Sequence, residues 1–484
     1  MEFVFWIGIP FLVLLAGLLY RVRPTLKLSP IPILGLLVVL TGSVLGHEFF
    51  NLPAGPIPLT LDRGLLIATA GLFAFFYFTK QEKIAPLNAL DVAILFLIAV
   101  IGVSTVTHNW QLLENMPASR LLFFNLLPVM LYWLVRNSRL KANDLKVIAA
   151  ALGVLGVYLA LTAVAEVKGV SAAVFPRYIM TSETVEFLGR GRGPFVNPVS
   201  NGIFMIVCLC CTMMWWPRLR SGWKTLVVVV ALLMAVGCYA TLTRSVWLSL
   251  IAACGIFIWM PSNRRAKGAM VVLATVAGIA LFPVLSEKVF SFKRDKEVSV
   301  TQMAVSAQMR PMFLYVATKM FQDRPVFGVG FGQYPDAKTP YLSDPNSGQP
   351  LTITKSLMQH NVFLAYLTET GLIGLSALTL MLLLMLFTSW KVWRNDSLNL
   401  WARQFGLLGV VMLSCYCVNG MFHDVSIIPM NHVFLFFLLG LINNIFSNAY
   451  AFAPEDESVV VAGSAPTNTT GGEFPSPGAW ANQV

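Results

Sequence analysis

His360 stands where a long polar segment gives way to a long apolar one. Asn361 follows it, and the apolar run 362–387 then begins. An imidazole can take up a proton near neutral pH, so His360 could act as a general base on a sugar hydroxyl. A polar anchor at a membrane interface is the alternative interpretation. Glu369 lies nine residues further on, where an acidic side chain could serve a substrate site or cap a helix break at Gly371.

Arginines in three other places could bind an anion. Arg190 and Arg192 lie in a Gly-Arg-Gly-Arg-Gly sequence, where the glycines let the backbone approach a ligand and the guanidinium fork suits phosphate. A basic loop beside lipid headgroups is the alternative for this motif. Arg244 lies in a very short turn between two apolar segments, where an arginine is costly unless it is paired or bound to an anion.

Arg310 belongs to the polar segment before His360 and could guide a pyrophosphate or an anionic glycan. We expect most of the other cations of this segment to be solvated: Lys288, Lys293, Arg294, Lys296, Lys319, Arg324, Lys338 and Lys355. The sequence Gly328-Val-Gly-Phe-Gly332 lacks the strand and helix that flank a nucleotide-binding loop, so we expect a tight turn packed on the membrane face.

The composition places these residues in a membrane protein. Of 484 residues, 57% are hydrophobic and 12% are charged, whereas soluble proteins carry about 25% charged residues. Because a helix crosses the hydrocarbon in about 20 residues, the apolar runs predict an all-α polytopic membrane protein with about 12–13 spans. The runs are 3–20, 30–46, 65–79, 89–107, 120–135, 147–166, 199–217, 224–242, 245–260, 268–285, 361–388, 404–419 and 428–447.

The net charge of +11 reflects cations that gather in alternate loops, such as Lys80 with Lys83 and Arg264 with Arg265. This alternation predicts that those loops are cytoplasmic and that the long loops 167–198 and 286–360 are extracytoplasmic. It also explains the positive charge without a nucleic-acid partner.

We expect three regions. Residues 1–166 form N-terminal membrane helices, 167–450 hold both long loops and the candidate chemistry, and 451–484 form a disordered tail.

No Asp-x-Asp pair and no His/Cys cluster occurs in the predicted outer loops, so we expect neither a metal nor another cofactor. All seven cysteines lie in apolar runs, where they are expected to pack as small hydrophobic residues.

Four motifs together resemble the O-antigen ligase and polymerase superfamily of bacterial envelope glycosyltransferases. They are Arg192-Gly-Pro-Phe-Val-Asn-Pro-x-x-Asn-Gly, Leu242-Thr-Arg-Ser-Val-Trp, Arg324-Pro-Val-Phe-Gly-Val-Gly-Phe-Gly, and His360-Asn with Glu369-Thr-Gly-Leu-Ile-Gly. The resemblance covers about 190–380 and implies a membrane helix bundle with a large extracytoplasmic loop.

The resemblance further implies a metal-independent, inverting transferase in the inner membrane. It would move a glycan from undecaprenyl pyrophosphate to an acceptor hydroxyl on a glycan, lipid or protein at the extracytoplasmic face, as in lipopolysaccharide synthesis. His360 would be the base, and Arg192 and Arg244 would stabilise the pyrophosphate. Arg190, Arg310, Asn361 and Glu369 are the further candidates for substrate binding.

Two other functions fit parts of the sequence. A polysaccharide polymerase of the same superfamily would use the same donor. A polysaccharide transporter would be expected to show inverted repeats with broken helices near the midplane, and the apolar runs show no two-fold repeat.

Overall fold

The computed structural model describes residues 28–454, except 55–56, 112–115, 182–186, 263, 266, 269–299, 345–346 and 356. In this part of the chain, nine helices are long and apolar enough to cross a membrane, and two shorter apolar helices accompany them. The chain is therefore a multi-pass, all-helical membrane protein, as its composition predicts. The predicted spans 3–20 and 268–285 (apart from residue 268) and the tail after 454 lie outside the described residues.

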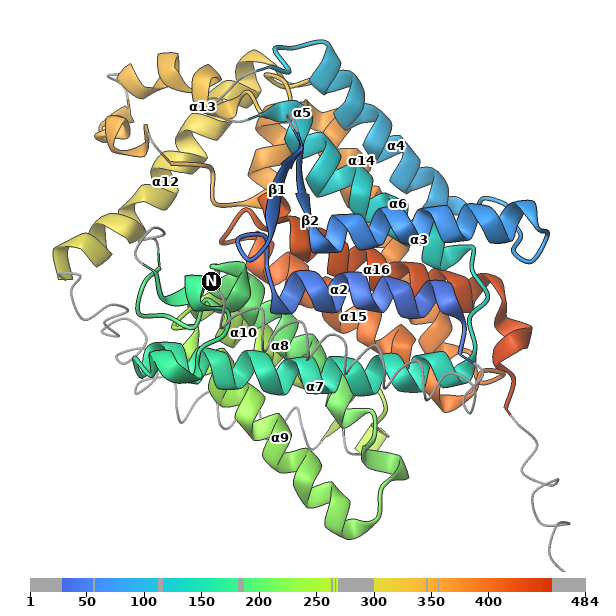
Figure 1. Cartoon of the computed structure of the whole chain (residues 1–484). Coiled ribbons are helices and arrows are strands. Elements are labelled where there is room, and N and C mark those ends of the chain that lie inside the picture. The colour runs from blue at the N-terminus through green and yellow to red at the C-terminus, as the bar shows by residue number, and fades with distance from the viewer. Residues whose placement is uncertain are drawn as a thin grey trace, which may run out of the picture.

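The N-terminal half is a series of membrane helices joined by short connections (Figure 1). A small hairpin, in which β1 pairs antiparallel with β2, connects the first two described helices. The span Pro117–Arg136 is continuous but contains a π-helical turn between its two α-helical parts. The elements are α2 (Pro30–Val44), β1 (Asn51–Ala54), β2 (Ile57–Thr60), α3 (Leu61–Phe78), α4 (Ala89–Val106), α5 (Pro117–Arg120), η1 (Leu121–Leu126), α6 (Leu127–Arg136) and α7 (Ala142–Val167).

The C-terminal half supplies the remaining membrane helices and an additional helical lobe. Its main elements are α8 (Pro198–Met213), α9 (Ser221–Ala240), α10 (Arg244–Trp259), α12 (Val300–Asp323), α13 (Tyr334–Ala337), α14 (Val362–Arg394), α15 (Leu400–Gly420) and α16 (Pro429–Ser447). Short 3₁₀ turns lie at η2 (Ser171–Ala173), η3 (Arg177–Met180), η4 (Gly193–Phe195), η5 (Trp216–Arg218), η6 (Thr339–Ser343), η8 (Leu351–Thr354), η9 (Val425–Ile427) and η10 (Ala449–Phe452).

Asparagine side chains begin several of these helices. The side chains of Asn88, Asn197, Asn361 and Asn399 accept backbone N–H groups in the first turns of α4, α8, α14 and α15. Such caps satisfy donors that the first helical turn would otherwise leave unpaired. The positions at which the chain enters these helices are therefore fixed by local sequence.

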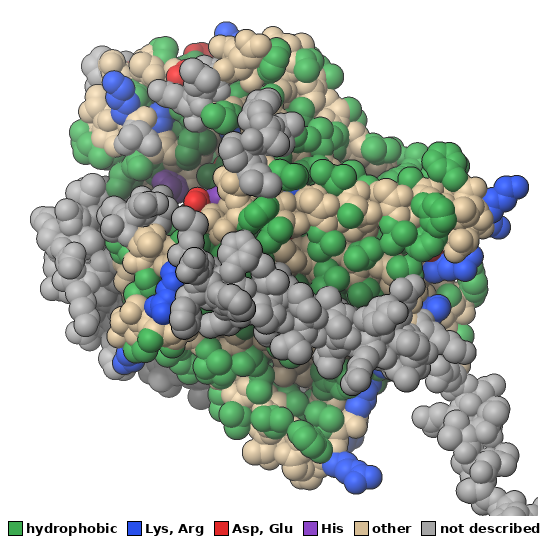
Figure 2. Space-filling view, viewed as in Figure 1, with side chains coloured by type: hydrophobic (Ala, Val, Ile, Leu, Met, Phe, Trp, Pro, Cys, Tyr) green, Lys and Arg blue, Asp and Glu red, His purple; other side chains and the backbone are tan. Residues whose placement is uncertain are grey.

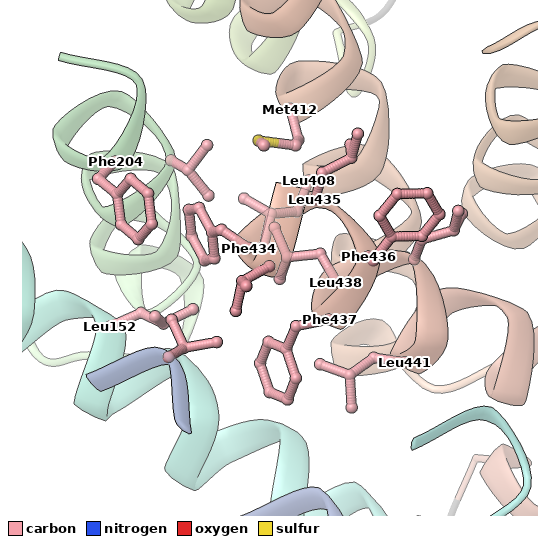
Figure 3. Packing of buried hydrophobic residues seen from close by; sticks show 14 of the residues in the cluster. Leu152, Phe204, Leu408, Met412, Phe434, Leu435, Phe436, Phe437, Leu438 and Leu441 are labelled. Atoms are coloured by element: carbon pink, nitrogen blue, oxygen red, sulfur yellow. The ribbon is translucent and has the colours of Figure 1, made fainter. Parts of the chain in front are cut away.

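The bundle is built around α16. In the apolar stretch of α16, 83% of the residues are buried, whereas in that of α3 only 17% are. The helix α16 therefore lies at the centre, while α3 presents most of its surface outward. Figure 3 shows the contact between α16 and α8, where Phe434 stacks on Phe204 with 4.2 Å between ring centroids. Leu408 and Met412 of α15 pack in the same core.

The α12–α13 lobe (residues 300–355) stands at one end of the bundle, beside the start of α14 (Figure 1). It has a small apolar core of its own, formed by Met312, Val316, Met320, Val329, Tyr334, Leu342 and Leu351. The predicted polar loop 286–360 thus contains a helix of 24 residues, which its polar composition concealed.

Candidate functional site

His360 lies between the lobe and the bundle, directly before the residue that caps α14. Its backbone takes the left-handed conformation, with φ at +52°, which is uncommon for a residue other than glycine. Its ring meets Phe313 of α12 edge to face, with centroids 5.4 Å apart. Strain of this kind persists only where the surroundings hold the residue in place.

The neighbours of His360 provide that restraint. Gln359 donates from Nε2 to Thr368 Oγ1 at 3.0 Å. Asn361 accepts the Leu364 N–H at Oδ1 and donates from Nδ2 to the carbonyl of Met421, each at 3.0 Å. The Asn361 amide thus connects α14 to the 421–428 loop, and any contact with a substrate stays a prediction.

Arg310 lies on the same helix as Phe313, the residue that meets the His360 ring, and it lies near enough to Arg244 to be affected by its charge. Arg310 precedes Phe313 by one turn of α12, and its guanidinium carbon lies 4.9 Å from the ring centroid of Phe422. Partial burial and the neighbouring positive charge of Arg244 lower the pKa of Arg310. Within the described ranges, neither arginine has a carboxylate at ion-pair distance. Two neighbouring cations with no carboxylate partner among the described residues form a suitable place for a dianion.

The structure places Arg192 elsewhere. Its side chain is fully buried, its Nε donates to Glu166 Oε1 at 2.9 Å, and its backbone N–H donates to Glu166 Oε2 at 2.7 Å. The guanidinium is thereby used in a buried ion pair with α7. Its predicted contact with pyrophosphate stays a prediction, and the observed role of Arg192 is to hold the motif that follows it.

Arg190 belongs to the same buried turn. Its guanidinium carbon lies 5.1 Å from the ring centroid of Phe187. The next residue, Gly191, donates its N–H to the carbonyl of Ala240 at 2.9 Å, at the end of α9 and just before the turn that carries Arg244. This hydrogen bond joins the glycine–arginine motif to the end of α9, four residues before Arg244.

Glu369 is buried in α14 and holds the glycine-rich segment in place. Its carboxylate accepts a bond from Arg120 Nη1 at 3.3 Å and from the Gly332 N–H at 3.0 Å. The backbone N–H groups of Val329 and Gly330 donate to the carbonyls of Thr368 and Glu369, each at 2.9 Å. Substrate binding by Glu369 stays a prediction, whereas its contacts connect the lobe to the bundle.

A break in α14 makes room for this segment. Gly371 has φ at +65°, and a Cβ built there would lie 2.3 Å from the carbonyl oxygen of Val326. Gly328 also lies against α14, because a Cβ there would meet the Glu369 backbone at 2.5 Å. The two glycine motifs found in the sequence are therefore two sides of one contact, and the glycine-rich segment packs against α14, while its place relative to the membrane face stays a prediction.

Two residues of this region were missed or wrongly interpreted from sequence. Arg120, the partner of Glu369, begins an apolar run, and only its charge at the edge of a span could have drawn attention to it. Lys338 belongs to the loop cations of which most were expected to be solvated, but it is 1% exposed and its ammonium donates to the carbonyls of Thr354 and Leu357. Burial lowers the pKa of Lys338 to about 8.

A cavity of about 410 Å³ lies among α2, α3, η1 and the start of α16. Its floor is apolar, with Val38, Leu66 and Val433 among its residues, and its rim carries polar groups that include Arg63 and Asn197. Two segments already described form part of its wall: Pro194–Asn197, which follows Arg192, and Ile427–Met430, which follows the 421–424 turn. An apolar cavity with a polar rim suits an amphiphile.

Figure 2 shows where charged and histidine side chains lie on one face of the molecule. Histidine side chains show in a recess between the α12–α13 lobe and the helices below it, and Lys and Arg side chains show both along the right-hand edge and on the left, on the lobe and below the recess. Among the described residues, no group of three or more His, Cys, Asp or Glu side chains could hold a metal ion. A role in chemistry for His360, Arg244 and Arg310 stays a prediction.

A membrane-embedded helical bundle with such a site is the architecture that the sequence motifs predict for a lipid-linked glycan transferase. Residues 229–379 match the family model described as O-antigen ligase. The chain therefore carries an O-antigen ligase domain, which contains Arg244, Arg310, His360, Asn361 and Glu369 and leaves the Arg190–Arg192 motif outside. A search among curated proteins gives no match.

Proposed function

We propose that the protein transfers a glycan from undecaprenyl pyrophosphate to an acceptor hydroxyl at the outer face of the inner membrane. The observation that carries the proposal is the proximity of Arg310 to Arg244 and, through Phe313 on the same helix, to His360, with all three residues in the segment that matches the O-antigen ligase model. A base near two arginines that have no carboxylate partner among the described residues suits a reaction in which a hydroxyl loses its proton while a phosphate leaves.

In the proposed reaction, His360 accepts the proton of the acceptor hydroxyl. The acceptor oxygen attacks the anomeric carbon of the donor sugar and forms the new glycosidic bond. The bond from that carbon to the phosphate oxygen breaks, and undecaprenyl pyrophosphate leaves with the electron pair. A single displacement inverts the anomeric carbon, and His360 later returns its proton to water. No metal ion has a part in this scheme.

Arg244 and Arg310 act on the leaving group. Charge grows on the pyrophosphate as the bond breaks, and cations fixed near the low-dielectric membrane stabilise that charge more strongly than cations in water do. We assign Arg192, Asn361 and Glu369 to positioning, because each is tied to backbone or to a buried partner, and Arg190 with them, because its guanidinium lies over the Phe187 ring.

The cavity of about 410 Å³ supports the lipid part of this proposal. Its apolar floor could receive the first units of the donor's isoprenoid chain, while the pyrophosphate reaches the arginines past the segments 194–197 and 427–430. The segment 427–430 follows the loop to which Asn361 is bonded at Met421, so chain and headgroup would occupy neighbouring spaces.

The direct test is product formation by the purified full-length chain with a glycan on undecaprenyl pyrophosphate. Candidate acceptors are offered separately: a lipid A core, a second lipid-linked glycan, and a peptide with serine. We expect an elongated acceptor and release of undecaprenyl pyrophosphate in equal amounts. Extension of the second lipid-linked glycan alone would identify a polymerase. Absence of transfer to all three acceptors, with a folded protein, would contradict the proposal.

A further inference from the structure

The end of α14 far from His360 forms a second pocket, of about 450 Å³, that the proposed transfer does not use. It is bounded by the last turn of α14, the start of the connection to α15, and the end of α16. Apolar walls come from Val392, Leu398, Ile445 and Phe446, and two cations, Lys391 and Arg394, lie at its edge.

Both cations are exposed and lack an acidic partner. In the part of the chain that the structure describes, neither Lys391 nor Arg394 lies at ion-pair distance from a carboxylate. Asp396, the nearest acidic residue in sequence, is instead paired with Arg403 at 2.9 Å. The dipole of α14 places only about half a negative charge at its C-terminal end, so the two cations leave a net positive charge there.

Aromatic residues place this pocket at the depth of lipid headgroups. Trp390 is 47% exposed and Tyr450 is 84% exposed, and they flank the pocket on α14 and after α16. Exposed tryptophan and tyrosine side chains collect at the membrane–water interface, because they have an apolar ring and a polar group. The pocket therefore offers positive charge at its edge and apolar surface inside, at the level where a phospholipid presents a phosphate above its chains.

We infer that this pocket binds the headgroup of an anionic phospholipid, with the phosphate between Lys391 and Arg394 and the upper chain against Phe446 and Ala449. Basic pockets between membrane helices recognise anionic lipids through this combination of charge and apolar contact. The predicted cytoplasmic position of these loops agrees with an abundance of anionic lipid in that leaflet. The inference does not depend on the proposed transfer.

Native mass spectrometry of the full chain in mild detergent tests this site. The protein is titrated with palmitoyl-oleoyl phosphatidylglycerol and, as a neutral comparison, with palmitoyl-oleoyl phosphatidylcholine. We expect one phosphatidylglycerol to be retained preferentially. Its affinity should fall roughly 30-fold in the double variant Lys391→Gln/Arg394→Gln, because each basic residue contributes about fivefold to the binding of an anionic lipid. High salt should weaken binding to the wild-type protein in the same direction.

The matched control is Arg264→Gln/Arg265→Gln, which removes the same charge from exposed residues beyond the end of α10. This control should retain the lipid with wild-type affinity. Equal losses in both double variants, or equal retention of both lipids by the wild-type chain, would overturn the inference. Excess inorganic phosphate should not displace the lipid, because apolar walls hold its chain; full displacement would assign the pocket to free phosphate and also overturn the inference.

Discussion

Arg244 gives the sharpest prediction at the scale of single residues, because its charge and its shape can be separated. Arg244→Lys keeps the positive charge but replaces the planar fork with a point donor. If the arginine binds pyrophosphate bidentately, we expect kcat/KM for transfer to fall by at least about tenfold, the loss of one charge-assisted hydrogen bond. Arg264→Lys, on an exposed arginine far from the site, should leave kcat/KM unchanged. Normal transfer by Arg244→Lys would reduce Arg244 to an electrostatic role.

Lys338 predicts an unusual dependence of stability on pH. Its pKa is about 8 in the folded chain and ordinarily about 10.5, because burial disfavours the charged form. Between these values the unfolded chain binds the proton and the folded chain does not, so the free energy of unfolding should rise as pH increases from about 8 to about 10.5. Thermal unfolding of the purified protein across this range measures the effect.

A comparison of variants isolates the Lys338 contribution from other titrating groups. Lys338→Met removes the buried ammonium, so the rise in its melting temperature with pH should be smaller than in the wild-type protein. Lys355→Met, at an exposed lysine of the same lobe, should behave like the wild type. Identical pH profiles for Lys338→Met and the wild-type protein would show that the buried lysine does not titrate in this range.

Sequence indicated which residue types matter at the site but not how they are grouped. His360 and Arg244 were found from their positions at the ends of apolar runs, and the structure adds Arg310 to them through a helix that the sequence analysis did not predict. Glu166, the partner of Arg192, is separated from it by 26 residues, and pairing at such separations cannot be read from a single sequence.

At the scale of elements, the break in α14 is the feature on which the lobe depends. Gly371→Ala should be strongly destabilising, because it adds a Cβ at a positive φ and 2.3 Å from the Val326 carbonyl oxygen. We expect a loss of more than about 2 kcal/mol from strain and the lost contact. Protease cleavage within the lobe, followed over temperature, would reveal its release from the bundle.

Gly255→Ala provides the matched control for this change. Gly255 lies in α10, and no atom lies within 4 Å of a Cβ built there. That variant should be neutral or more stable by up to about 1 kcal/mol, because alanine favours the helix. Equal protease resistance in both variants would show that the contact between Gly371 and Val326 does not hold the lobe.

The membrane helices were predictable because their signal is compositional. The apolar runs matched α7, α9 and α16 to within a few residues, since lipid requires continuous apolar surface and internal backbone hydrogen bonds. The lobe helix α12 was not predicted, because its low hydrophobicity and Pro311 resemble a loop. The break at Gly371 was weighed only as one of two interpretations of Glu369, because a single glycine in an apolar run is also compatible with a straight helix.

At the scale of the whole molecule, orientation follows from the distribution of cations. The predicted topology puts the lobe outside the cell and the α10 end inside it. In intact spheroplasts, an impermeant maleimide should label Gln349→Cys and leave Arg265→Cys unlabelled until the membrane is opened. Both positions are exposed in the structure, so access depends on the side of the membrane alone. The reverse pattern would move the candidate site to the cytoplasmic face.

Transfer by the His360→Ala variant tests the central claim most directly. The account predicts that transfer from the lipid-linked donor falls about 10²- to 10⁴-fold, the usual loss when a general base is removed. Donor affinity, measured on the same preparation, should remain close to that of the wild-type protein, because Arg244 and Arg310 are intact. Turnover near the wild-type rate, with donor affinity also unchanged, would contradict the role given to His360 and with it the proposed mechanism.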